Sequence, residues 1–188
     1  MKLITAPHLV CVLAVIGTLA SLSFAEIGGR SGRSKTFNGT ATVGNGECRF
    51  SISLEPVSFA VNSVAGKYKL VEVSIENRGT TPLVLSSDQD HFDAVINGQV
   101  VPAVLSLQRA DSVLWDSYSI STRKDLAYPL RVGAAMAAVG GRDIVAEYMS
   151  MFVFLPADRV SGIPTEFRYT IASLGTTVTL RQPPATAQ

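Results

Sequence analysis

Apolar and polar side chains alternate with a period of two over several short stretches of this chain. In the clearest stretch, Val71, Val73 and Ile75 are separated by glutamate and serine residues. A strand places successive side chains on opposite faces, so this pattern buries one face and exposes the other. The same alternation recurs at Phe50–Leu54, Leu83–Leu85, Phe92–Ile96, Phe167–Ile171 and Val178–Leu180. We therefore expect a chain built mainly from β-strands.

Turn residues separate these stretches. Asn97-Gly98 is the strongest turn signal, because both residues accept a positive φ, and it predicts a tight hairpin into a strand over residues 99–105. Gly175 predicts a turn before the last strand. Pro56 interrupts an apolar pattern that resumes at Val57–Val61, which favours an edge strand with a kink.

Two segments depart from simple alternation. Residues 144–155 are apolar on both parities, which favours a long central strand covered on both sides for part of its length. Residues 106–142 disperse their aromatic residues among polar ones, and we expect them to be irregular, with one or two short strands and a short helical turn at 134–138. Seven or eight strands without a long amphipathic helix predict an all-β fold, an antiparallel two-sheet immunoglobulin-like sandwich over residues 47–181.

The strand and turn layout also resembles a known family. The blocks that carry the resemblance are KYKLVEVSIENRGTTPLVLSSDQDHFDAVINGQVV and GGRDIVAEYMSMFVFLPA, within Tyr68–Pro156. They look like the layout of secreted bacterial immunoglobulin-like domains of the immunoprotective extracellular family, although the long insert between the blocks departs from that family's spacing. The resemblance implies a sandwich fold and a secreted setting, and the family has no catalytic residues to carry over.

The first 25 residues have the pattern of a cleavable export signal. Lys2 precedes an apolar run from Leu9 to Ala20, and Ser23 and Ala25 are small residues of the kind that a signal peptidase recognises. The run is shorter than the roughly 20 residues that span a bilayer. We expect cleavage near Ala25 and a secreted or periplasmic protein without a permanent membrane anchor.

Both ends of the remaining chain are expected to lack structure. Residues 26–46 are rich in Gly, Ser and Thr and are expected to form a flexible leader, and residues 182–188 are expected to form a disordered tail. Without residues 1–25 the chain has 15 basic and 15 acidic residues. This balance does not favour nucleic acid or an anionic membrane as a partner, because both require clustered positive charge.

The sequence contains few residues suited to catalysis. After cleavage only one histidine, His91, and one cysteine, Cys48, remain, so no internal disulfide can form. Nucleophilic catalysis needs a nucleophile, a base and an orienting group within reach of one another. We expect neither an enzyme nor a bound cofactor, with a hydrolase using His91 as a further alternative. Cys48 is expected to be buried as a small apolar residue.

A periplasmic metal-binding module is the main alternative. Asp88, Asp90, His91 and Asp93 lie within six residues, and oxygen-rich loops bind calcium in extracellular modules. The same residues also suit a polar turn in which aspartates cap backbone groups. A Cu(I) site at Met136, Met149 and Met151 is a second metal alternative, although methionines on a strand commonly fill a core.

Recognition of another macromolecule is the function that we expect. Sandwich domains bind partners through end loops or exposed sheet edges. Trp115, Tyr118 and Tyr128 in the long middle segment are the candidate contact residues, because aromatic side chains dominate binding energy at interfaces. The alternative is that these rings cap the open end of the core. The expected partner is another protein or an envelope component.

Overall fold

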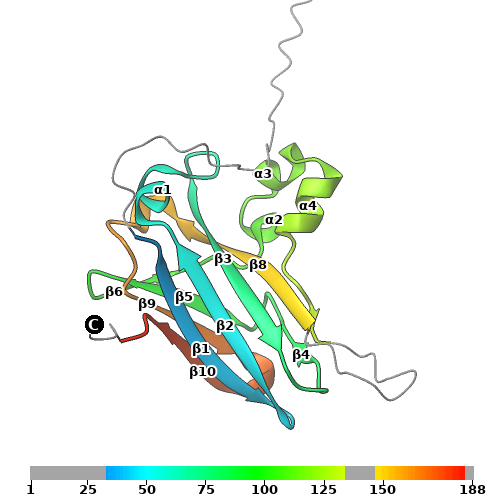
Figure 1. Cartoon of the computed structure of the whole chain (residues 1–188). Helices are drawn as coiled ribbons and strands as arrows, with labels where there is room; N and C mark the ends of the chain where they lie inside the picture. The colour runs from blue at the N-terminus through cyan, green and yellow to red at the C-terminus, as the bar shows by residue number, and fades with distance from the viewer. Residues whose placement is uncertain (1–32, 134–146, 185–188) are drawn as a thin grey trace, which may run out of the picture. The chain divides into compact units, whose positions relative to one another are not determined.

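The computed structural model describes residues 33–133 and 147–184, and its fold is all-β. Eight strands form one antiparallel sheet in the order β6-β5-β9-β10-β1-β2-β3-β8, and two short strands form a separate pair (Figure 1). The strands of the large sheet are β1 (Lys35–Val43), β2 (Gly46–Leu54), β3 (Tyr68–Asn77), β5 (His91–Ile96), β6 (Gln99–Pro102), β8 (Glu147–Pro156), β9 (Glu166–Ile171) and β10 (Thr176–Arg181). The small pair consists of β4 (Leu83–Val84) and β7 (Arg131–Val132).

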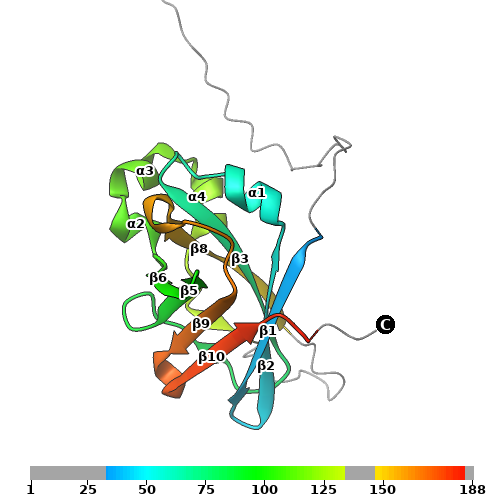
Figure 2. The same ribbon diagram turned by 90° about the vertical axis from the view of Figure 1, so that its left-hand side faces the viewer.

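The large sheet folds over so that one half covers the apolar face of the other (Figure 2). β1 belongs to both halves, because it pairs with β2 along its whole length and with β10 at Asn38 and Arg181. Phe37 of β1 meets Phe167 of β9 edge-on, with ring centroids 5.0 Å apart. Phe50 of β2 meets Tyr169 of β9 in the same way at 5.8 Å. These rings form the centre of a core that both halves share.

The two ends of the sheet meet at one residue pair. Val104, just after β6, and Phe154 of β8 exchange two backbone hydrogen bonds, with N···O distances of 2.7 and 3.0 Å. These bonds satisfy backbone groups of β8, which is the last strand in the sheet order. The strand predicted over residues 99–105 is therefore shorter than expected, and its last part joins β8 instead.

The period-two pattern predicted the main strands correctly. Val71, Val73 and Ile75 are buried along β3. The hairpin at Asn97-Gly98 is present, with φ angles of 51° and 78°. The other alternating stretches also bury their apolar side, in the strands β2, β5, β9 and β10. The two facing halves agree with a sandwich-like arrangement, and an immunoglobulin-like relationship remains a prediction.

The structure corrects the prediction for residues near the first strand. Residues 35–43 were expected in a flexible leader, but they form β1 and bury Phe37 and Val43. The prediction of a kinked edge strand after Pro56 is also wrong, because Pro56–Val61 is the helix α1. The Glu55 carboxylate accepts hydrogen bonds from the backbone N–H groups of Val57 and Ser58 at 3.2 and 2.5 Å. Proline at the first helical position needs no N–H partner, so it starts this helix.

The middle segment is helical where it was expected to be irregular. It forms α2 (Leu107–Ala110), α3 (Ser112–Ser117) and α4 (Ile120–Leu126) before β7. Asp111 and Ser119 cap α3 and α4, because their side chains accept hydrogen bonds from the N–H groups of Leu114 and Thr122. Each cap satisfies an N–H group that a helix start leaves without a partner. α4 contacts β8.

β8 is covered on both sides for part of its length, as its apolar pattern predicted, but it is not a central strand. Met151, Val153 and Leu155 point into the core, and Phe154 on the opposite parity is also fully buried. The strand lies at the end of the sheet order, beside β3. The export signal at residues 1–25, residues 26–32 of the leader, the helical turn at 134–138, and residues 144–146 and 185–188 lie outside the described residues.

Two turns approach each other closely at glycines. A Cβ atom on Gly46, at the start of β2, would lie 2.2 Å from the Cα atom of Gly79, in the turn after β3. Neither backbone can move without disturbing its strand, so only glycine fits at Gly46.

We expect Gly46→Ala to lower the free energy of unfolding by about 2 kcal/mol, the usual cost of inserting an atom into packed structure. Gly162→Ala is the matched control, because its added Cβ would meet the flexible side chain of Asn97 at 3.2 Å and the side chain of Ile96 at an ordinary contact distance of 3.7 Å, and no backbone atom closer than these. The control should change stability by no more than about 0.5 kcal/mol. Urea unfolding measures both variants, and equal losses would contradict the close approach of the two turns.

Candidate functional site

The four candidate metal ligands do not converge. The Asp88 carboxylate forms an ion pair with Arg109, His91 is exposed at the start of β5, and Asp90 is buried. Asp93 lies on the outer face of β5, opposite Arg168 of β9. Among the described residues, no group of three or more His, Cys, Asp or Glu side chains could hold a metal ion. In this loop the Asp90 carboxylate accepts a hydrogen bond from the backbone N–H of Ser86, which is the kind of capping contact expected of a polar turn.

Asp90 is the centre of a buried hydrogen-bond cluster. One carboxylate oxygen accepts from the backbone N–H of Ala172 at 2.9 Å, and the other from the N–H of Ser86 at 2.9 Å. The second oxygen also accepts from the hydroxyls of Tyr128 and Tyr169, at 2.9 and 3.3 Å. The two hydroxyl oxygens lie 2.5 Å apart. The carboxylate thus joins the loop before β5, the end of β9 and the segment that follows α4.

The three candidate contact aromatics have different environments. Tyr128 is held by Asp90, so its hydroxyl stabilises the fold and is not available to a partner. Trp115 lies in α3 and Tyr118 caps its C-terminus, and both side chains are half-buried. The structure therefore favours the capping role for Tyr128.

Cys48 and the two described methionines belong to the core. Cys48 is fully buried on β2, as expected, and its burial raises the pKa of the thiol to about 11. Met151 is fully buried and Met149 packs against the core beside it. Met136, the third residue of the copper alternative, lies outside the described residues.

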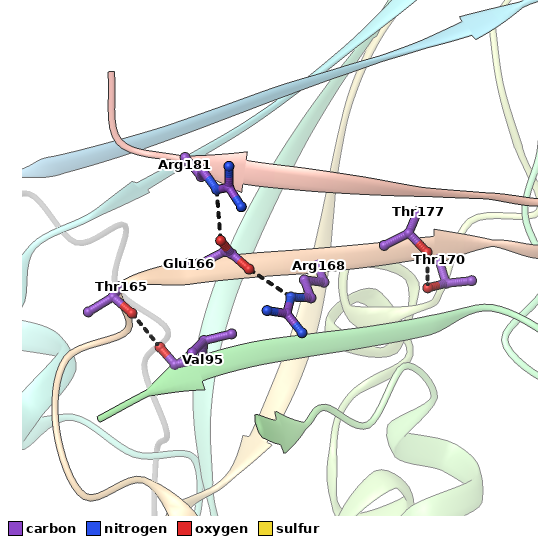
Figure 3. Close-up of polar contacts among 7 residues, drawn as sticks. All are labelled: Val95, Thr165, Glu166, Arg168, Thr170, Thr177 and Arg181. Atoms are coloured by element: carbon purple, nitrogen blue, oxygen red, sulfur yellow. Dashed lines mark hydrogen bonds and ion pairs between the residues drawn. The ribbon is translucent and has the colours of Figure 1, made fainter. Parts of the chain in front are cut away.

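A charged cluster on the outer face of β9 and β10 was not predicted. The Glu166 carboxylate accepts a hydrogen bond at 2.7 Å from the Nε–H of Arg168 and another at 2.7 Å from that of Arg181 (Figure 3). Arg168 is two residues further along β9, and Arg181 lies directly opposite Glu166 on β10. These hydrogen bonds, from Arg181 first and then Arg168, hold the pKa of the Glu166 carboxyl below its usual range. Glu166 thus stays ionised and holds both arginines.

This cluster lines an open cleft of about 550 Å³. Lys35, Arg168 and Arg181 supply three positive charges around it, and Glu166 supplies one negative charge. The remaining lining residues are Val95, Thr165 and Gln182. The side chains of Arg181 and Arg168 are 71% and 44% exposed, whereas that of Glu166 is only 15% exposed. The positive groups therefore face solvent, and the carboxylate lies beneath them.

A second hollow of about 480 Å³ lies on the outer face of β1, β2 and β3. Its lining includes Arg49, which donates to Glu47 at 2.6 Å, and Tyr148, whose hydroxyl donates to Ser74 at 2.7 Å. With Glu47 and Glu76 beside Arg49, this hollow has no excess of positive charge. It therefore offers less to a charged ligand than the cleft at Glu166.

The sequence contained a weak indication of the cleft. The pattern Glu-x-Arg occurs at Glu47–Arg49, Glu76–Arg78 and Glu166–Arg168, and the two residues of each pair form an ion pair. Only Glu166 has a second arginine, because the hairpin places Arg181 opposite it. The register of the β9–β10 hairpin therefore distinguishes the Glu166 pair from the other two. The Glu-x-Arg pattern in the sequence does not reveal this register.

Comparisons with known proteins give no relative for this chain. No family model, curated protein or solved structure matches it. None of the helices in the described residues is long and apolar enough to cross a bilayer.

We expect Tyr128→Phe to lower the free energy of unfolding by about 2 kcal/mol, because it removes a hydrogen bond to a buried carboxylate. Tyr148→Phe is the matched control, since its hydroxyl is exposed and bonds only Ser74. The control should change stability by less than about 0.5 kcal/mol. Urea unfolding compares the two, and a similar loss in both would show that the Asp90 cluster contributes little.

The stability of the protein should fall in alkali. Burial, together with the neighbouring hydroxyl and carboxylate, raises the pKa of Tyr128 well above its ordinary value, and burial raises that of Tyr169 and Cys48. The folded state therefore keeps protons that the unfolded chain releases above about pH 9 to 10. The stabilisation is complete below that pH and is lost as the pH rises further.

This dependence can be assigned to one side chain. Above about pH 10, the unfolding free energy of the wild type should fall more steeply than that of Tyr128→Phe, by about 1.4 kcal/mol per pH unit. Urea unfolding at a series of pH values gives both slopes. Parallel slopes would mean that Tyr128 ionises as readily in the folded protein as in the unfolded chain.

Proposed function

We propose that this protein is an exported, non-catalytic binding module that recognises another protein at the cell envelope or outside the cell. The proposal of export rests on the signal predicted at residues 1–25. We also propose that the fold is immunoglobulin-like, and this rests on the layout of strands and turns in the sequence. The observation that carries the proposal is the cleft at Glu166, where two exposed arginines are held in place by a shared carboxylate.

An organised pair of arginines suits binding. Long side chains lose rotamer freedom when they are immobilised in a complex, at a cost of about 0.5–1.5 kcal/mol each. The hydrogen bonds that Arg168 and Arg181 donate to Glu166 restrict both side chains before any partner arrives. Part of the ordering cost is then met within the free protein, and arginine is one of the residues that most often dominate binding energy.

The chemistry of the described residues gives less support to a hydrolase. His91 is exposed on β5, across the strand pair from Thr170, and makes no side-chain hydrogen bond to any described residue. A base of a catalytic triad is held by an orienting group and lies within reach of a nucleophile. Thr170 itself bonds Thr177 at 2.8 Å. Recognition therefore agrees better with the geometry than catalysis does.

Site-specific crosslinking tests this proposal. A photoreactive amino acid placed at Thr179, on the outer face of β10 beside the cleft, should yield a defined adduct with the native envelope or extracellular fraction. The same group at Ser53, on the outer face of β2, is the control position. We expect an adduct from Thr179 whose yield Arg181→Gln lowers, and none from Ser53.

Two results would overturn the proposal. One is that neither position yields an adduct while the protein is properly folded. The other is turnover of a small substrate by the purified protein that His91→Ala abolishes. An adduct from Ser53 alone would keep a binding function but move it to the other half of the sheet.

A further inference from the structure

We infer that the cleft at Glu166 binds a carboxylate of a partner protein, an aspartate or glutamate side chain next to an apolar residue. The inference rests on the proposed binding function and names the chemistry that the cleft recognises. It depends on the unused donors of two arginines, on the local balance of charge, and on the apolar residues beside them.

The arginine donors that remain point to an anion. Each guanidinium uses its Nε–H on Glu166, and its terminal nitrogens have no hydrogen-bond partner among the described residues. Terminal N–H groups of arginine form paired hydrogen bonds to carboxylates and phosphates. Lys35 lines the same cleft and adds a third positive charge. An anion in the cleft could therefore be bound by two oriented arginines.

The balance of charge favours a carboxylate over a phosphate. Three cations and Glu166 give the lining a net charge of +2. Asp93 on β5 lies opposite Arg168 on the same outer face and lowers the surrounding charge further. With Asp93 counted, three positive and two negative groups leave a net charge of +1 around the cleft. One carboxylate neutralises this charge, whereas a phosphate group with up to two negative charges would leave an excess negative charge beside Glu166 and Asp93. A polyanion requires clustered positive charge, and this surface alternates in sign.

Apolar residues next to the arginines favour a peptide. Val95 lines the cleft and is paired across the strands with Val100 of β6, so both side chains lie on the same outer face. Val100 is 53% exposed. The side-chain amide of Gln182 lines the same cleft and can bond backbone groups of a peptide. The Thr165 hydroxyl donates to the Val95 carbonyl at 3.2 Å and can still accept from a peptide N–H. A segment with an acidic residue beside an apolar one fits both features.

Peptide binding followed by NMR tests the inference. The probe is acetyl-Leu-Glu-Ser-Leu-amide, and its matched control replaces glutamate by glutamine. The protein is the ¹⁵N-labelled form secreted by an expression host. We expect the glutamate peptide to shift amide signals of residues 165–168 and 181–182, and the glutamine peptide to bind up to about fivefold more weakly, the largest effect usual for losing an exposed charge pair.

Two substitutions locate the binding site. Arg181→Gln should weaken binding of the glutamate peptide by about fivefold. Arg49→Gln is the matched control, because Arg49 also bonds a glutamate two residues away on its strand, but that glutamate, Glu47, is not shared with a second arginine among the described ion pairs. The control should bind as the wild type does. Dispersed amide signals in both variants show that they are folded.

The alternative ligands are tested with the same spectra. Sodium phosphate and heparin are titrated in parallel, and tighter binding of either one at residues 165–168 would overturn the peptide inference in favour of a phosphate or a polyanion. Equal binding of both peptides, or no shift near the arginines, would also overturn it. If the peptide fails while Thr179 still yields its Arg181-dependent adduct, the binding function stands and only the ligand class is wrong.

Discussion

One antiparallel sheet has to bury its own apolar face, and the rest of this structure depends on that constraint. β1 makes it possible, because it pairs with β2 on one side and with the end of β10 on the other. The two halves can then turn toward each other, and the Phe37–Phe167 contact closes the space between them. The Val104–Phe154 pair satisfies backbone groups at the opposite end of the sheet order, where an open edge would expose them. The outer faces of both halves are left to solvent and to partners.

Asp90 is a buried polar residue that helps to hold the folded sheet together. A buried carboxylate is costly unless several donors surround it, and here two backbone N–H groups and two tyrosine hydroxyls do so. Its partners come from segments that are far apart in sequence, so the cluster holds them together. The same donors occupy the oxygens that a metal ion would need. Burial and hydrogen bonding thus explain why an acidic loop can be structural.

The sequence predicted strands well wherever burial alone decides the pattern. Val71, Val73 and Ile75 alternate because one face of β3 meets the core, and this is a local property of the chain. β1 was missed because Phe37 and Val43 are its only large buried side chains, and Thr and Gly surround them. Its place in the sheet comes from pairing with β2. Pairing between strands is a property of two segments, which a single stretch of sequence does not reveal.

The helices were missed for a different reason. α2, α3 and α4 are too short for an apolar period to stand out, and α3 and α4 begin at the polar caps Asp111 and Ser119. A cap is a single polar residue that also suits a turn, so its meaning depends on what the chain packs against. α1 was missed because Pro56 is compatible both with an edge strand and with the first turn of a helix. The Glu55 carboxylate favours the helix, because it accepts hydrogen bonds from the backbone N–H groups of Val57 and Ser58 in the first turn.

The cleft depends on register in the same way. Arg181 is opposite Glu166 because the hairpin from β9 to β10 turns at Gly175, whose φ of 58° favours glycine. Side chains alternate along a strand, so a shift of one residue would turn Arg181 toward the core and Leu180 toward solvent. The burial of Val178 and Leu180 opposes that shift. The apolar face of β10 therefore fixes the position of the arginine on its other face, and the core of the domain determines which charges the outer surface presents.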